Sequence, residues 1–175
     1  MSYQERYIES RKKYGRKCTT LARKRLHFLG ICDYEISMKE DHRRKFITIA
    51  GFNEPSTEKE IVINIENLKS FINKLNWVFM FGKKYEHNSS QKQENGTPAV
   101  VFKDEICTVE GRFYTFELIK KPEALEFCLK HSFLGSETSL MIELEYLKTL
   151  VRIIENFKNE YWSNEPEGKL VPLGS

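Results

Sequence analysis

Residues 61–79 read IVINIENLKSFINKLNWVF, a stretch that begins as a short apolar strand and continues without a break into a helix. The helix carries one apolar stripe at i, i+3, i+4 and i+7, formed by Leu68, Phe71, Ile72 and Leu75. Residues 63–72 align without a gap with residues 142–151, and the two segments share their apolar positions, a Glu and a Leu-Lys pair. Internal similarity of this kind indicates that the chain uses one supersecondary unit twice.

Four segments with strand character precede each copy of the helix, because apolar and polar residues alternate with a period of two. In the first copy the expected strands lie at about 19–30, 34–39, 46–49 and 60–65. In the second copy they lie at 100–109, 112–119, 125–133 and 139–144, followed by a helix over about 146–161. The sequence therefore predicts an α+β fold made of two ββββα repeats.

Polar segments divide the chain into five parts. We expect a basic N-terminal arm over 1–18, a first repeat over 19–81, a polar linker over 82–98, a second repeat over 99–162 and a flexible tail over 163–175. The terminal LVPLGS resembles a protease-site linker left from expression, so it is excluded from fold reasoning.

The net charge of +3 conceals a strong asymmetry along the chain. Residues 1–25 contain nine Lys or Arg and two Glu, which gives this segment +7 and leaves −4 for the remainder. Such clustering fits a partner with dense negative charge, nucleic acid before an anionic membrane. A solvated tail that aids solubility or nuclear import is the alternative interpretation.

Apolar runs are far shorter than the roughly 20 residues of a membrane-spanning helix, and the N-terminus lacks the order of a signal peptide. We therefore expect an intracellular protein, nuclear and/or cytoplasmic, with reduced cysteines and no membrane partner.

Catalytic and metal-binding signatures are mostly absent, and the histidines are dispersed. Asp104, Glu105 and Glu117 are candidate ligands for a metal-dependent nuclease, but acidic residues are common at solvent-facing strand positions. We therefore expect no enzymatic activity, no metal and no cofactor, with the nuclease as an alternative.

Cations gather in the turn KEDHRRKF over residues 39–46. Lys39, Arg43 and Lys45 precede the aromatic Phe46. Cations neutralise phosphates, and an aromatic ring offers a stacking surface to an unpaired base, so the combination favours a single strand over a duplex. A solvated charged turn with Phe46 in the core is the alternative interpretation.

The two-fold ββββα plan, the sequence LARKRL, this turn and the following ITIA resemble the PUR repeat family of purine-rich-element-binding proteins. In that family the corresponding segment runs approximately Lys-x-Asn-x-Lys/Arg-Gly-Arg-Phe, and Lys39, Arg43, Lys45 and Phe46 stand at its basic and aromatic positions. Asp41 replaces the Asn and Arg44 replaces the Gly.

The second copy keeps only the Lys, at Lys120, and the aromatic, at Phe127, so its nucleic-acid face is expected to be weakened. The resemblance covers about residues 19–161.

The resemblance implies one intertwined PUR domain with curved antiparallel sheets backed by helices, which binds purine-rich single-stranded DNA or RNA without catalysis. The residues implied in binding are Arg23, Arg25, Lys39, Arg43, Lys45, Phe46, Lys120 and Phe127. The third repeat that mediates dimerisation in family members is not present, which leaves open a homodimer formed through the second copy.

Two alternatives keep a similar plan. One is a protein-interaction or dimerisation module of the same fold that has lost nucleic-acid binding, which the acidic, Pro-containing second turn favours. The other is a Whirly-like single-strand-binding domain, which changes the oligomer but not the class of function.

Overall fold

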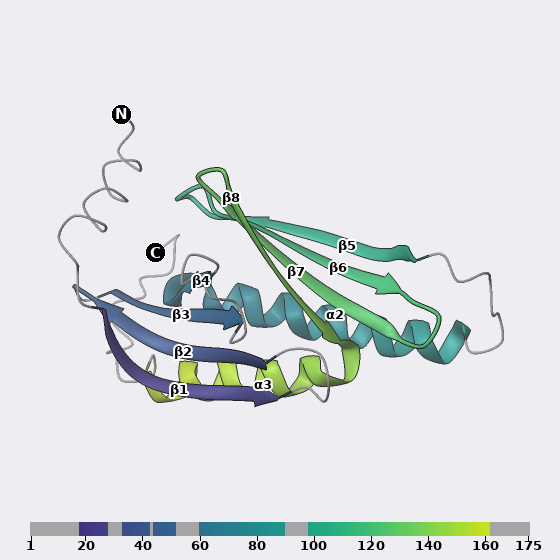
Figure 1. Cartoon of the computed structure of the whole chain (residues 1–175), viewed down its shortest axis with the longest axis horizontal. Helices are drawn as coiled ribbons and strands as arrows, with labels where there is room; N and C mark the ends of the chain where they lie inside the picture. Colours follow the sequence, from purple (N-terminus) through teal and green to yellow (C-terminus); the bar gives the residue numbers. More distant parts are fainter. Residues whose placement is uncertain (1–17, 28–32, 43, 52–59, 90–97, 162–175) are drawn as a thin grey trace, which may run out of the picture.

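The computed structural model describes residues 18–27, 33–42, 44–51, 60–89 and 98–161. Arg43, most of the basic arm and the tail after residue 161 lie outside these ranges. The first repeat contains β1 (Thr19–His27), β2 (Asp33–Asp41), β3 (Arg44–Gly51), β4 (Glu60–Asn64), a single 3-10 turn η1 (Ile65–Asn67) and the helix α2 (Leu68–Ser89). The second contains β5 (Ala99–Cys107), β6 (Phe113–Lys120), β7 (Leu125–Phe133), β8 (Ser136–Glu143) and α3 (Leu144–Tyr161). The predicted α+β class and two-fold ββββα order are confirmed (Figure 1).

Each repeat forms its own four-stranded antiparallel sheet, with the strands in chain order. The register of the first three strands repeats at an offset of 80 residues, and the fourth strands, β4 and β8, are related by an offset of 79. Both first strands have a β-bulge at the same place, between Thr20 and Ala22 in β1 and between Val100 and Phe102 in β5. A shared bulge supports the equivalence of the two copies, because a bulge is a specific feature of one strand pairing.

Each helix contacts the sheet of the other repeat, so the two repeats are intertwined (Figure 1). In α2, the Phe71 ring lies 5.4 Å from the Tyr114 ring and 5.2 Å from the Phe116 ring, both in β6. In α3, Tyr161 Oη donates a hydrogen bond to the carbonyl oxygen of Leu21 in β1, at 3.2 Å. The helices also pack against each other.

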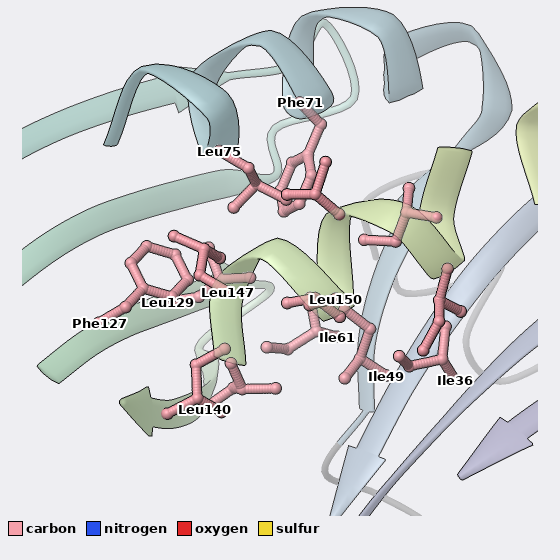
Figure 2. Close-up of a cluster of buried hydrophobic side chains, with 14 of the residues drawn as sticks. Ile36, Ile49, Ile61, Phe71, Leu75, Phe127, Leu129, Leu140, Leu147 and Leu150 are labelled. Carbon is pink, nitrogen blue, oxygen red and sulfur yellow. The ribbon is translucent and has the colours of Figure 1, made fainter. Parts of the chain in front are cut away.

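One hydrophobic core joins both repeats, because both helices bury their apolar stripes between the sheets (Figure 2). Figure 2 shows side chains of the two sheets and the two helices meeting in this cluster, among them Ile36, Ile49, Ile61, Phe71, Leu75, Phe127, Leu129, Leu140, Leu147 and Leu150. The first repeat therefore depends on the second for burial of its helix.

The inner edges of the sheets are held by two equivalent tyrosines. Tyr34 Oη in β2 donates to the carbonyl oxygen of Met141 in β8 at 3.2 Å and accepts from the Met141 amide at 3.3 Å. Tyr114 Oη in β6 donates to the carbonyl oxygen of Val62 in β4. Each tyrosine thus binds edge backbone of the other repeat.

Some boundaries differ from the sequence prediction. The helix α2 continues to Ser89, whereas the polar linker was expected to begin at residue 82. The Phe81 ring packs against Phe102 of β5 at 4.9 Å and Tyr85 at 6.4 Å, which anchors the second half of the helix despite its polar composition.

The strand β8 begins at Ser136, earlier than expected, because Leu134 and Gly135 form a tight turn. Both residues have positive φ, 53° and 76°, as a two-residue hairpin of this twist requires.

Candidate nucleic-acid interface

The first sheet has one face against the helices and one face directed away from them, here named the first outer face. Strand alternation places Ile36, Met38 and Ile47 on the helix side and their neighbours on the other. The described side chains of the first outer face include Arg23, Arg25, His27, Glu35, Ser37, Lys39, Phe46, Thr48, Glu60 and Val62.

Two guanidinium groups of β1 share one carboxylate of β2 on this face. Arg23 Nε lies 3.5 Å from Glu35 Oε1, and Arg25 Nε lies 3.7 Å from Glu35 Oε2. The two arginine side chains are 64% and 52% exposed. Because two cations meet one anion, the trio has net positive charge at the margin of the sheet.

Lys24 lies between the two arginines and is also exposed, although its side chain belongs to the opposite face. Its exposure follows from the position of β1 at the edge of the sheet. The exposed residues Arg23, Lys24 and Arg25 are named the β1 cationic edge.

The middle of the first outer face is closed to solvent. Ser37 and Thr48, in the two central strands, are each only 2% exposed. Lys39 Nζ lies 3.5 Å from Glu60 Oε1, so this cation is paired across the sheet. The accessible positive charge of the described part of this face therefore lies along β1 and at Arg44, the exposed first residue of β3.

Phe46 was expected to be an exposed stacking ring, and the structure corrects this expectation. The residue lies on the first outer face, directly opposite Lys39 in β2, but is only 6% exposed. A ring with so little exposed area offers almost no surface to a base, although Phe46 lies on the outer face rather than in the core cluster, where the alternative interpretation placed it.

Lys45 is separated from Lys39 and Phe46 by the alternation of β3. Its Nζ donates a hydrogen bond to the carbonyl oxygen of Tyr161 at 3.2 Å, at the C-terminal end of α3. A cation at this position stabilises the helix dipole. Lys45 therefore has a structural contact on the helix side, and the predicted cluster of Lys39, Lys45 and Phe46 is not assembled on one face.

The predicted equivalents in the second repeat, Lys120 and Phe127, are displaced by one residue from the true register. Phe127 pairs with Leu118 and Ile142 on the helix face and is fully buried. Since a one-residue shift moves each side chain to the other face, Phe127 corresponds to Ile47. By the same register, Lys39 and Phe46 correspond to Ile119 and Glu126.

The second outer face is the equivalent face of the second sheet, and it is acidic. Its described carboxylates are Glu105, Glu117, Glu126, Glu137 and Glu143, and its described strand cations are Lys103 and Lys130. Lys103 Nζ lies 3.8 Å from Glu105 and Lys130 Nζ lies 3.5 Å from Glu117, so both cations are already paired.

Exposed apolar side chains accompany these carboxylates, namely Val100, Phe113 and Met141. The two outer faces therefore differ in chemistry, one with a cationic margin and the other acidic and partly apolar. This difference disfavours phosphate contact on the second sheet.

The acidic residues considered for a nuclease are divided between the two faces of the second sheet, because Asp104 lies on the helix face whereas Glu105 and Glu117 lie on the second outer face. Asp104 and Glu105 are neighbours in β5 and point to opposite faces of the sheet. The Lys74 ammonium hydrogen bonds to Asp104 and holds the pKa of its carboxyl below the ordinary value. Within the described ranges, no three His, Cys, Asp or Glu residues gather closely enough to hold a metal ion.

Glu35 and Glu60 are residues of this face that were not predicted to belong to the site, whereas the period-two pattern already placed His27 on the same face as Arg23 and Arg25. The position of Glu35 could have been predicted, because the period-two pattern and the pairing of β1 with β2 place it on the same face as Arg23 and Arg25. The contribution of Glu60 depended on the pairing of β4, which alternation within one strand does not reveal.

The fold and the site define a class: an intertwined, two-repeat ββββα protein with a cationic edge strand. No protein-family model matches the chain, and no curated protein matches it significantly. No helix in the described part of the chain is both long enough and apolar enough to cross a lipid bilayer.

Proposed function

We propose that this chain binds single-stranded DNA or RNA, without catalysis, along the β1 cationic edge. The observation that carries the proposal is the row of three consecutive exposed cations, Arg23, Lys24 and Arg25, on an edge strand. Glu35 orients the two guanidinium groups while leaving the row positive. Contacts of this kind neutralise phosphates and release counterions.

The geometry favours an extended strand lying along β1. Guanidinium planes stack on bases as well as contacting phosphates, and the exposed His27 follows Arg25 on the same face at the end of β1. An unpaired strand offers its base faces to these groups, whereas a duplex hides them. Stacking is thus assigned to Arg25 and His27 rather than to Phe46.

The proposal is tested by fluorescence anisotropy with a labelled purine-rich single strand over a series of salt concentrations. We expect Arg23→Ala/Arg25→Ala to reduce the slope of log K against log salt by about 1.4, at about 0.7 per phosphate contact on a single strand. The matched control is Lys69→Ala/Lys148→Ala, which removes two exposed cations on the helices α2 and α3. The control variant should keep the wild-type slope.

An equal loss of slope in both double variants would overturn the proposal, because it would indicate nonspecific attraction by net charge. Phe46→Leu provides a second check, since leucine keeps the site apolar but removes the ring. We expect its affinity to stay near the wild-type value. Competition among purine-rich and pyrimidine-rich DNA and RNA at fixed salt then tests the purine preference that the PUR resemblance implies.

A second candidate function, a protein-interaction module, is favoured by the exposed Val100, Phe113 and Met141 beside the carboxylates of the second outer face. Proteins that copurify after nuclease digestion, and that are lost in a Phe113→Asp variant, would support it. Retention of the same proteins by Phe113→Asp would exclude this face.

A further inference from the structure

Each sheet has one edge strand that is bonded by a tyrosine from a strand of the other repeat, and one edge strand that contacts the other repeat only through its helix. The edges formed by β4 and β8 receive hydrogen bonds from Tyr114 and Tyr34 of the opposite repeat. The edges formed by β1 and β5 are at the other ends of the strand orders. In Figure 1, β5 lies along the outer margin of its sheet, with β6 on one side and no described strand on the other. An edge of this kind is a template for pairing with another chain.

The side chains of β5 have an arrangement suited to pairing with a copy of itself. Lys103 and Glu105 lie on the second outer face, whereas Phe102, Asp104 and Ile106 lie on the helix face. On the second outer face, the residues before and after Asp104 carry opposite charges. On the helix face, Asp104 lies between two apolar side chains.

An antiparallel pair of β5 strands with its two-fold axis at Asp104 satisfies both faces. Lys103, which lies 3.8 Å from Glu105 of its own chain, then also lies opposite the partner's Glu105, and Phe102 lies opposite the partner's Ile106, with each contact made twice. Directly opposed side chains of opposite charge stabilise an antiparallel pair, and like charges destabilise it. The two nearest registers that keep each side chain on its face place Lys103 opposite the partner's Lys103, or Glu105 opposite the partner's Glu105. The sequence of β5 therefore selects one register.

The two Asp104 side chains meet at the axis, and each already has a counterion. Lys74 of α2 hydrogen bonds to Asp104 within the same chain, so each carboxylate arrives as part of an ion pair. This pairing removes the main electrostatic objection to the register.

The equivalent edge strand β1 has the opposite property. Its residues Arg23, Lys24 and Arg25 stand where β5 has Lys103, Asp104 and Glu105. The same construction on β1 would oppose Arg23 with the partner's Arg25 and Lys24 with the partner's Lys24, so cations would meet cations at the three central positions. Charge of one sign on an edge strand prevents edge-to-edge association. The two edge strands therefore differ in charge pattern: two copies of β1 would repel each other, whereas two copies of β5 have complementary charges.

We propose that two copies of this chain associate through β5, antiparallel about a two-fold axis at Asp104, so that the two four-stranded sheets become one continuous sheet. An isologous contact of this kind closes on itself and yields a dimer rather than a fibre. The β1 cationic edges remain at the two far margins of the joined sheet. The proposal does not depend on nucleic-acid binding.

Charge reversal tests the register directly by sedimentation velocity on nuclease-treated protein over a concentration series. Lys103→Glu places Glu opposite Glu, and Glu105→Lys places Lys opposite Lys, so each single variant should weaken the dimer by roughly tenfold or more. The double variant Lys103→Glu/Glu105→Lys restores opposite charges across the axis and should restore the dimer. Recovery in the double variant also shows that the single variants failed to pair rather than failed to fold.

Arg23→Glu is the matched control, because it changes the equivalent position on the other edge strand and should leave the dimer unchanged. The proposal is overturned if the wild-type chain sediments as a monomer at its highest soluble concentration. It is also overturned if the double variant is no tighter than the singles, or if Arg23→Glu weakens the dimer as much as Lys103→Glu.

Discussion

The hydroxyl group of Tyr34 hydrogen bonds to both the carbonyl oxygen and the amide of Met141, at 3.2 and 3.3 Å, and so joins β2 of the first repeat to the edge of β8 in the second. Tyr114 and Val62 make the equivalent contact in the other direction. Burial raises the pKa of Tyr114, so its hydroxyl remains a donor. The two hydroxyls thus satisfy edge backbone that the sheets themselves leave unpaired.

Removing either hydroxyl should weaken the junction between the repeats. We expect Tyr34→Phe and Tyr114→Phe each to lower the free energy of unfolding by about 1–2 kcal/mol, since a part-buried backbone group loses its partner. Urea denaturation followed by circular dichroism measures the change, and the m value should stay constant because the surface exposed on unfolding is the same. A loss below about 0.3 kcal/mol in both variants would mean that water replaces the hydroxyls without cost.

Lys45 should contribute to stability rather than to nucleic-acid affinity, because its ammonium contacts the C-terminal carbonyl of α3 at Tyr161. We expect Lys45→Ala to lower the free energy of unfolding by about 0.5–1 kcal/mol and Lys45→Arg to retain most of it. The salt slope of oligonucleotide binding should be unchanged in Lys45→Ala. A drop of about 0.7 in that slope would instead assign Lys45 a phosphate contact.

The strands and the repeat could be predicted from the sequence because alternation is a local property of each strand. The same alternation places Lys45 and Phe46 on opposite faces, so the separation of these residues was available in the pattern. The predicted equivalence of Phe46 and Phe127 was wrong because it rested on matching the two aromatic residues. The strand register instead matches Phe127 with Ile47. A difference of one residue is enough to reverse the face.

The contact of each helix with the sheet of the other repeat was not encoded in any single segment. The apolar stripe that includes Leu68 and Leu75 fits either sheet equally well, and only the packing of both repeats decides which sheet it covers. The length of α2 was missed for a related reason. Its second half has a polar composition, and its anchor, Phe102, comes from a distant strand.

Gly82 should resist substitution even though it lies within α2. Glycine in a helix interior is normally about 1 kcal/mol less favourable than alanine. A Cβ at this position, however, would lie 2.6 Å from Leu144 Cδ2 and 2.9 Å from Leu144 Cδ1. Overpacking of this kind costs about 1–3 kcal/mol, so we expect Gly82→Ala to destabilise the chain.

Chemical denaturation compares Gly82→Ala with Ser70→Ala, a control at an exposed position of the same helix that should be neutral or stabilising. Gly82→Ala/Leu144→Val should lose less than the sum of the single changes, because the smaller side chain makes room for the new methyl group. A stabilised Gly82→Ala variant would show that Leu144 moves aside without cost.

His131 should make the stability of the fold sensitive to mild acid. Its ring stacks on Tyr114 with the centroids 5.0 Å apart, and Arg112 Nη1 lies 3.2 Å from its Nε2. Burial, together with the Arg112 guanidinium, lowers the pKa of His131 from 6.5 to about 4. Glu110 Oε2, 3.5 Å from Arg112 Nε, is the acidic group facing this cluster.

The depressed pKa fixes the direction of the effect. Between pH 6.5 and about 4 the unfolded chain binds a proton at His131 that the folded chain excludes, so stability falls as the pH falls through this window. The loss should be on the order of 3 kcal/mol across the window. His131→Gln keeps a hydrogen-bond acceptor for Arg112 but does not titrate, so its stability should decline less steeply over the same range. Urea denaturation at a series of pH values measures both slopes, and parallel curves for wild type and variant would show that protonation of His131 is not coupled to unfolding.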